Sequence, residues 1–363
     1  MPDRRNFLAG GLAASLCPRL SWADAGNPAY LAAAQGAYGR HVLVGLDAAG
    51  QERFSLKLPA RGHAAAAHPR RPEATAFARR PGTFALVVDC IDGRVRAVLD
   101  APEGRHFYGH GAYSADGRLL FTPENDYANA RGVVGIWDAE AGYLRIGEFA
   151  SHGIGPHDIL LMQDGATLAV ANGGIETRPD TGRAKLNIPF MRPNLAYVTL
   201  DGALLDSVEP PEEWRQNSIR HLALGPDGTI AFAMQWQGDA ARHPPLLGLH
   251  RRGSAPDFLA APEAAHRRME NYAGSVAISG DGRHAAISSP RGGLVQIFDI
   301  AAQGYAGAVD CADVCGLAPG RDGLIATSGT GGIVALRGTE RLWQSSHRLH
   351  WDNHLVTVGG ARV

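Results

Sequence analysis

The chain has 363 residues, of which 35 are basic and 36 acidic, and its formal net charge is −1. Nucleic acid and anionic lipid surfaces both attract a basic field, so this balance argues against either as the main partner. A hydrophobic content of 45% with only 20% charged residues excludes a disordered chain. The 46 glycines and 22 prolines indicate many tight turns and therefore favour β-structure.

The first 25 residues have the pattern of an export signal. Arg4-Arg5 precedes an apolar stretch rich in glycine, alanine and leucine, and Ala23-Asp24-Ala25 has the form of a cleavage site. This resembles a twin-arginine signal peptide, with an ordinary signal peptide as the alternative. The apolar stretch is shorter than the roughly 20 residues of a membrane span, and no other segment is suitable. We therefore expect a signal peptide over 1–25 and a periplasmic domain without a membrane span over 26–363.

One sequence pattern recurs after the predicted signal peptide: an apolar run, a turn containing Asp-Gly, and a second apolar run. Asp-Gly between alternating apolar runs is a strong signature of a β-hairpin. Two degenerate copies begin at His63 and His354. The copies recur roughly every 40–60 residues, which is enough for the four short strands of one propeller blade. The five complete copies have their turns at 116–117, 164–165, 227–228, 281–282 and 322–323.

The seven copies predict an all-β, seven-bladed β-propeller of the WD40/YVTN-like kind. The last blade would be split between the two ends of the chain. Its innermost strand would be 355–358, and its other strands 29–34, 41–46 and 52–58. This closure joins the first blade to the last and leaves no exposed sheet edge.

The first strand of each propeller blade lines the central channel, so equivalent positions form a ring around the axis. The chain has only 15 histidines, so five of them at seven equivalent positions are not expected by chance. Converging imidazoles repel one another when protonated, and they are best satisfied as neutral ligands of a cation. The alternatives are a hydrogen-bonded polar ring and a metal-free anion or substrate site. In register, the ring comprises His63, His110, His157, His221, Ser275, Cys315 and His354.

We therefore predict that the five histidines bind a metal, with Cys315 as a further candidate ligand. Imidazole suits zinc, copper, iron and nickel, whereas a cysteine ligand would favour copper. Either one ion or two ions are compatible with the ring. The residues after each second strand return to the same end of the channel, where they would orient the imidazoles or form a substrate mouth; a polar rim without function is the alternative. Together with Ser275, these residues are Glu124, Asn125, Asn172, Arg178, Gln235 and Arg291.

Three cysteines follow the signal: Cys90, Cys311 and Cys315. An odd number cannot pair completely, and Cys311 and Cys315 can either form a disulfide or stay reduced. The sequence has no nucleophile elbow, P-loop, HExxH or haem-attachment motif, so no catalytic residue can be assigned.

Several short motifs add a resemblance to a known group. They are the arginine signal, Gly-His-Gly at 109–111, Gly-Pro-His-Asp at 155–158, Ala-Asn-Gly-Gly at 171–174 and Arg-His-Leu at 220–222. Together they resemble an uncharacterised family of exported bacterial propellers encoded beside imelysin-type iron-uptake proteins. The resemblance implies periplasmic iron handling with such proteins as partners, and it places iron before copper and zinc. A metal-dependent oxidoreductase and a metal-free interaction scaffold are the competing functions.

Overall fold

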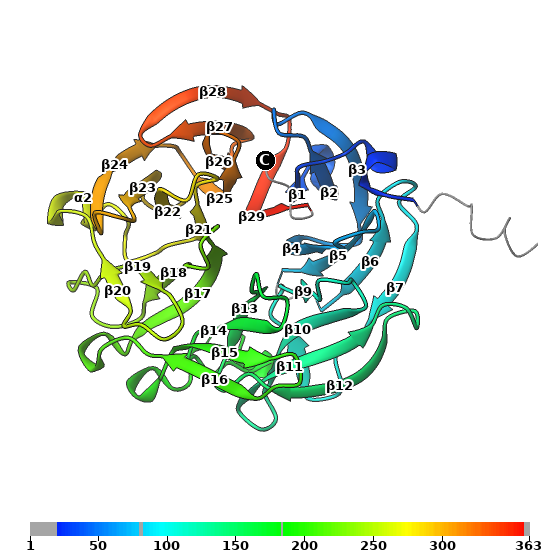
Figure 1. The fold of residues 1–363 in the computed structure, drawn as a ribbon, viewed down its shortest axis with the longest axis horizontal. Coiled ribbons are helices and arrows are strands. Elements are labelled where there is room, and N and C mark those ends of the chain that lie inside the picture. Colours follow the sequence, from blue (N-terminus) through cyan, green and yellow to red (C-terminus); the bar gives the residue numbers. More distant parts are fainter. Residues whose placement is uncertain (1–19, 80–82, 183, 359–363) are drawn as a thin grey trace, which may run out of the picture.

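The computed structural model describes residues 20–79, 83–182 and 184–358, which form seven sheets around a central axis (Figure 1). This confirms the predicted seven-bladed propeller. Blade 1 comprises β4 (Gly62–Ala67), β5 (Glu73–Ala78), β6 (Ala85–Asp89) and β7 (Val95–Leu99). Blade 2 comprises β8 (Arg105–Phe107), β9 (Ala112–Tyr113), β10 (Leu119–Asp126), β11 (Arg131–Asp138) and β12 (Leu144–Ala150). Blade 3 comprises β13 (Pro156–Leu161), β14 (Thr167–Asn172), β15 (Asn194–Thr199) and β16 (Leu204–Val208).

The remaining blades follow the same order, from the axis outwards. Blade 4 comprises β17 (Asn217–Leu224), β18 (Ile230–Trp236), β19 (Leu247–His250) and β20 (Asp257–Leu259). Blade 5 comprises β21 (Ser275–Ile278), β22 (His284–Ser289), β23 (Leu294–Asp299) and β24 (Gly304–Asp310). Blade 6 comprises β25 (Val314–Gly320), β26 (Gly323–Ser328), β27 (Gly332–Arg337) and β28 (Glu340–Ser346). The short helices are η1 (Trp22–Ala25), η2 (Ala37–Gly39), η3 (Pro179–Thr181), η4 (Ile188–Phe190), η5 (Glu212–Trp214) and α2 (Glu263–Arg267).

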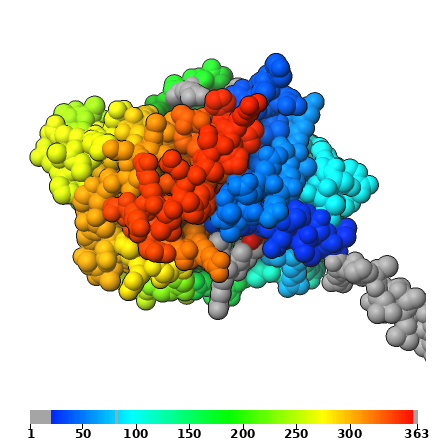
Figure 2. All heavy atoms as spheres, turned by 90° about the horizontal axis from the view of Figure 1, so that it is seen from above, coloured from blue at the N-terminus to red at the C-terminus, as the bar shows by residue number. Residues whose placement is uncertain are grey.

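The seventh blade is closed by both ends of the chain, as predicted. Its strands lie in the order β29 (His350–Thr357), β1 (Tyr30–Gln35), β2 (His41–Leu46) and β3 (Glu52–Leu58). The antiparallel ladder between β1 and β29 pairs Tyr30 with Thr357. Figure 2 shows the blue N-terminal and red C-terminal segments side by side at the edge of the disc. This pairing closes the ring without leaving a free sheet edge at the junction.

The Asp-Gly turns explain why the hairpins form where the sequence places them. In blade 2, a carboxylate oxygen of Asp116 accepts hydrogen bonds from the Ser114 hydroxyl at 2.6 Å and the Arg118 amide at 3.0 Å. Gly117 has a φ of 78°, a left-handed conformation that glycine adopts without a steric penalty. Asp281 makes the same two kinds of bond in blade 5. These turns place the start of each first strand at the opposite end of the channel.

The hydrophobic core is divided among the contacts between neighbouring blades. The described residues contain seven apolar clusters, and each combines strands of two adjacent blades. Blades 7 and 1, for example, share Leu31, Leu43, Ala76 and Val88. Because the packing lies between the blades, the central channel does not have to be filled with apolar side chains.

The described chain begins within the predicted signal peptide. Trp22 is buried, and its indole Nε1 donates a hydrogen bond to the main-chain oxygen of His68 at 2.9 Å. Trp22 and Ala25 pack with Leu58 and Leu86 in the cluster between blades 7 and 1. The twin-arginine motif itself lies outside the described residues. No helix in the described ranges is long and apolar enough to cross a membrane.

Candidate metal centre

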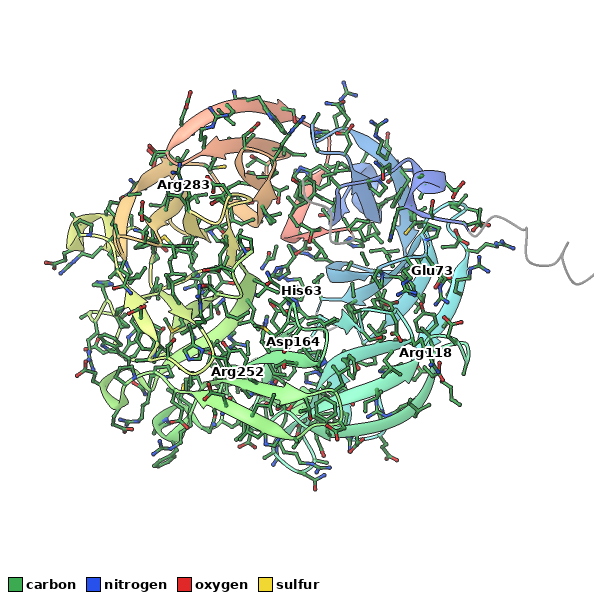
Figure 3. All side chains as sticks on the ribbon, in the orientation of Figure 1. His63, Glu73, Arg118, Asp164, Arg252 and Arg283 are labelled. Atoms are coloured by element: carbon green, nitrogen blue, oxygen red, sulfur yellow. The ribbon has the colours of Figure 1, made fainter. Side chains whose placement is uncertain are left out.

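The five ring histidines meet at the axis of the propeller. The imidazole of His354 lies 4.6 Å, centroid to centroid, from each of His63, His110 and His221. His157 lies 4.8 Å from His221 and 5.3 Å from His110. Figure 3 shows His63 at the centre of the ring of blades. Side chains separated by up to about 290 residues therefore form one compact cluster, which we call the histidine cluster.

Irregular backbone at the start of the inner strands accompanies the histidines. The ladder shifts register around His63 in β4, around His157 in β13 and around His354 in β29. His110 lies in the interruption between β8 and β9. Ser275, in contrast, belongs to a regular ladder in blade 5. A β-bulge bends a strand and re-aims a side chain, so these irregularities direct the imidazoles towards the axis. The regular pattern of apolar residues did not predict them.

The Gly-His-Gly motif has a steric reason. Gly109 has a φ of 100°, and a Cβ at this position would lie 2.5 Å from Cδ2 of His63. A Cβ on Gly111 would lie 2.8 Å from Cζ of Phe77. The two glycines therefore allow His110 and its blade to approach blade 1 closely.

The cluster offers buried nitrogen atoms that the protein does not use. Four of them have no hydrogen-bond partner among the described residues: His110 Nε2, His157 Nδ1, His221 Nδ1 and His354 Nε2. Burial and the neighbouring imidazoles hold the pKa values of His157, His221 and His354 well below 6.5. An unpaired buried polar atom is costly, whereas a neutral imidazole nitrogen is a good metal ligand. The arrangement therefore has the chemistry of a cation site.

Two overlapping groups of three histidines have the spacing of a metal site. One group is His63, His110 and His354, and the other is His110, His157 and His221. In each group the candidate ligand atoms lie within 4.8 Å of one another. Nitrogen ligands about 2.0–2.1 Å from one ion are roughly 3–4 Å apart, so small side-chain movements would close either group around an ion. Both groups require His110.

Asp158 orients His110 and limits the number of ions. Its Oδ1 lies 3.1 Å from His110 Nδ1, and the amides of Ile159 and Leu222 hold the carboxylate at 2.8 and 3.0 Å. This leaves only Nε2 of His110 for a metal, which favours one ion over two. Asp158 was not among the predicted site residues. The available clue was its position directly after the ring residue His157.

Replacement of Asp158 by asparagine should weaken metal binding without removing a ligand. The amide preserves the shape of the side chain but loses the charge that keeps His110 in the correct tautomer. Partners of this kind typically contribute 10–100-fold to metal affinity, and we expect a loss in this range. Competition with a chelator of known affinity measures it, with Asp164→Asn in the turn of the same blade as the control. Unchanged affinity would remove Asp158 from the site.

Cys315 is not brought into the histidine cluster. It belongs to neither group of three, and its Sγ donates a hydrogen bond to the main-chain oxygen of Asp313 at 3.1 Å. Burial raises the pKa of its thiol to about 12, so it stays protonated at neutral pH. Cys90, Cys311 and Cys315 are all free thiols. The thiolate argument for copper therefore has no support in this geometry.

Three of the predicted rim residues are buried in hydrogen bonds that connect strands or blades. The hydrogen bonds of these side chains do not include a ring histidine. Burial raises the pKa of the Glu124 carboxyl, although an arginine opposes the effect. These residues therefore stabilise the blades around the channel. The bonds join Glu124 to Arg145 at 2.5 Å, Asn125 to His106 at 3.1 Å, and Asn172 to Ser151 at 2.7 Å.

The other four rim residues divide between the loops and the axis. Arg178 is about half exposed and lies 3.5 Å from Glu176, and Gln235 donates a hydrogen bond to a main-chain oxygen. Ser275 and Arg291 line the two cavities described below. Only these two of the seven residues border the channel cavities.

Two cavities lie along the inner strands, and ring histidines line the first of them. The first has a volume of about 240 Å³ and is lined by His110, His221, His354 and Ser275, followed by apolar residues of the inner strands. The second has a volume of about 410 Å³ and lies at the ends where the inner strands begin. We call the first the lower chamber and the second the mouth. An ion in the cluster would be reached from one of these two sides.

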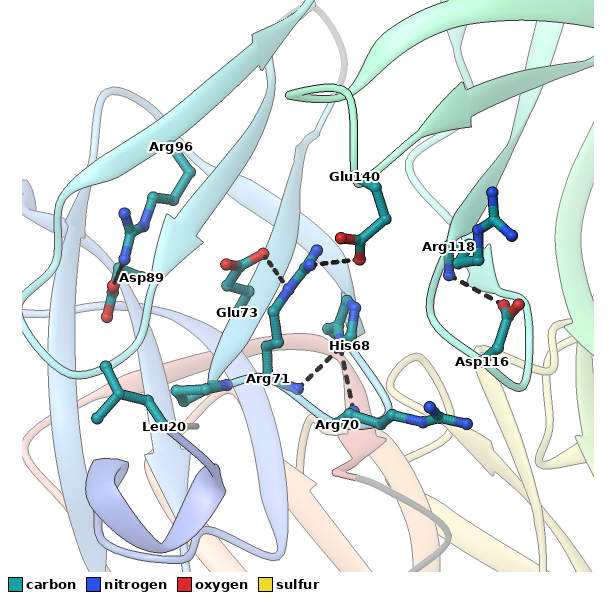
Figure 4. Close-up of a pocket in the computed structure, with 11 residues that line it drawn as sticks. Leu20, His68, Arg70, Arg71, Glu73, Asp89, Arg96, Asp116, Arg118 and Glu140 are labelled. Atoms are coloured by element: carbon teal, nitrogen blue, oxygen red, sulfur yellow. Dashed lines mark hydrogen bonds and ion pairs between the residues drawn. The ribbon is translucent and has the colours of Figure 1, made fainter. Parts of the chain in front are cut away.

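A further pocket of about 870 Å³ lies away from the axis between blades 1 and 2 (Figure 4). Its charged side chains largely neutralise one another. Arg71 pairs with Glu140 at 2.7 Å and with Glu73 at 3.3 Å, and Arg96 pairs with Asp89. We therefore assign no ligand to this pocket.

His68 in this pocket should make the protein sensitive to mild acid. Its Nδ1 accepts the amides of Arg70 and Arg71 at 3.0 and 2.9 Å, so only the neutral ring fits. Burial, reinforced by Arg71, lowers its pKa from 6.5 to about 4. The stabilisation is complete above pH 6.5 and is lost as the pH falls to 4, by about 3 kcal/mol. Urea unfolding of the wild type and His68→Gln at several pH values should show this difference in slope; parallel curves would contradict it.

Comparison with known proteins agrees with the fold. The sequence profile of the family described as "Protein of unknown function (DUF1513)" matches residues 56–358, and the chain belongs to this family. Among solved structures, Kuenenia stuttgartiensis hydrazine synthase is similar, with a TM-score of 0.57 and 13% sequence identity. The similarity covers 80% of this chain and 86% of that chain. At this identity it supports the fold alone. A search of the curated proteins finds no match.

Proposed function

We propose that the protein binds one iron ion at the histidine cluster and acts in periplasmic iron handling, with copper as the second choice of metal and zinc as the third. The observation that carries the proposal is the set of four buried imidazole nitrogens without hydrogen-bond partners in the described chain. Neutral imidazole favours iron, copper and zinc over magnesium and calcium. The absence of Cys315 from the cluster weakens the case for copper, and the family resemblance favours iron.

A metal-dependent oxidoreductase is the second candidate. The lower chamber borders His110, His221 and His354, so an ion held by these residues would face a cavity of about 240 Å³. Catalytic metal sites differ from structural ones by keeping such a position open for water or substrate. The metal would supply the redox chemistry, and the chain would hold the ion and limit the size of what reaches it.

The direct test is elemental analysis of protein purified without an affinity tag, together with an anomalous-scattering map. We expect one iron per chain at the axis. A visible absorption band that responds to a reductant would separate a redox metal from zinc. Folded protein without metal, even after incubation with Fe²⁺, would instead favour an interaction scaffold.

A double variant tests the assignment of the ligands. His110→Ala with His221→Ala removes ligands from both groups of three, so it should abolish stoichiometric metal binding while circular dichroism stays that of the wild type. Retention of the metal would refute the site. His284→Ala is the matched control, because His284 begins β22 at the opposite end of its blade.

The cellular location is part of the same proposal. A twin-arginine signal over residues 1–25 would export the folded protein to the periplasm, where iron-uptake proteins are the proposed partners. The buried Trp22 gives a specific readout, because cleavage after Ala25 would remove its packing. Mass spectrometry of the exported protein determines the cleavage position, and replacing Arg4-Arg5 by Lys-Lys should block export by this route.

A further inference from the structure

The mouth of the channel is lined by three arginines. Asp352 accepts a hydrogen bond from Arg61 at 2.6 Å with one oxygen and from Arg79 at 2.7 Å with the other. A single carboxylate thus holds two guanidinium groups side by side. Arg291 lies over the ring of Tyr272 at 4.3 Å and forms no ion pair with a carboxylate in the described ranges. Contacts within the protein therefore hold all three arginine side chains in place. The positive charge of Arg291 has no carboxylate partner among the described residues.

The lining of this cavity carries a net positive charge. Its basic residues are Arg61, Arg79 and Arg291, and its acidic residues are Asp313 and Asp352, so the cations are in excess by one.

This charge restricts how a metal can reach the histidines. A bare divalent cation would be repelled at the mouth, whereas the lower chamber is walled by apolar residues together with Asp158 and three of the ring histidines. An anion, in contrast, would be attracted to the mouth. The planar arginine side chain binds carboxylates through two parallel hydrogen bonds, and several arginines around one cavity suit an anion with several carboxylates.

We propose that the mouth binds a small polycarboxylate anion next to the histidine cluster. The inference rests on the proposed function, because it names the form in which iron would arrive: a negatively charged carboxylate chelate. The same chemistry also fits a free polycarboxylate that binds beside the metal. In both cases Arg291 contacts the anion, while the paired Arg61 and Arg79 shape the cavity.

Citrate is the probe for this site. Calorimetry should detect binding of citrate, of ferric citrate, or of both to the wild-type protein at low ionic strength. Loss of a charge-assisted hydrogen bond typically costs about 10–100-fold in affinity, so we expect at least a tenfold weakening for Arg291→Gln. Arg283→Gln is the matched control, because Arg283 is an exposed arginine of the same blade at the opposite end of β22. Affinity unchanged by Arg291→Gln, or no binding by the wild type, would overturn the proposal.

The measurements separate this inference from the metal site. Anaerobic loading with aqueous Fe²⁺ should be no slower in the mouth variant than in the wild type, whereas iron transfer from ferric citrate should slow at least tenfold. If the protein binds iron but neither binds citrate nor takes iron from ferric citrate, the proposed anion site at the mouth is wrong, while the proposed metal site at the histidine cluster stands. Citrate binding that survives His110→Ala with His221→Ala identifies the free anion as a ligand, and binding that requires the histidines identifies the chelate.

Discussion

Replacing His110 by alanine should remove the metal more completely than any other single substitution. His110 is the one histidine shared by both groups of three, and the Asp158 carboxylate holds its ring in place at 3.1 Å. Its loss would leave two candidate ligands in each group. We expect the affinity to fall by more than the 10–100-fold predicted for Asp158→Asn, measured by competition with a chelator.

The controls for this prediction use the other histidines. His63→Ala leaves the group of His110, His157 and His221 intact, so it should retain more metal than His110→Ala. His284→Ala should bind like the wild type. Equal loss in the His63 and His110 variants would place the ion in the group of His63, His110 and His354, which both substitutions break. Full retention in His110→Ala would contradict the shared-ligand geometry.

Replacing Arg145 by methionine should produce the largest loss of stability. Arg145 contacts both oxygens of Glu124, whose side chain is completely buried in blade 2. Removal of one partner leaves a buried carboxylate, with Arg105 at 3.7 Å as its remaining cation. Breaking such a pair costs about 3–5 kcal/mol, so we expect a decrease of about 3 kcal/mol in the free energy of unfolding. Urea unfolding measures it.

A second substitution distinguishes this role from a role at the channel. Glu124→Gln combined with Arg145→Met removes the buried charge and should recover part of the lost stability. In both variants, the folded fraction should bind metal with the affinity of the wild type, because Glu124 does not contact the histidine cluster. A change in metal affinity with unchanged stability would support the predicted role of Glu124 at the channel mouth.

The sequence by itself determined the architecture and the ring of histidines. Alternating apolar residues and Asp-Gly turns act between residues that are close in sequence, so each hairpin can be predicted from its own segment. Seven such hairpins in one chain favour a propeller, because the blades can pack against one another in a closed ring. The register of those repeats was enough to place His63 and His354 at the same level of the axis, although they lie at opposite ends of the chain. The split blade could also be predicted, because the two ends of the chain contain strands that belong to no other blade.

The partner of each polar side chain was decided only in the tertiary structure. Glu124, Asn125 and Asn172 follow or end second strands as predicted, yet they bind within and between blades, and Asn125 reaches the main chain of Thr177. No local sequence pattern predicted the bulges that direct the imidazoles towards the axis. The same is true of the contact between the Asp158 carboxylate and His110. A hydrogen bond depends on distance and direction between groups far apart in sequence, whereas strands and turns depend on sequence neighbours. For this reason the ring of residues could be predicted, and the geometry of the site could not.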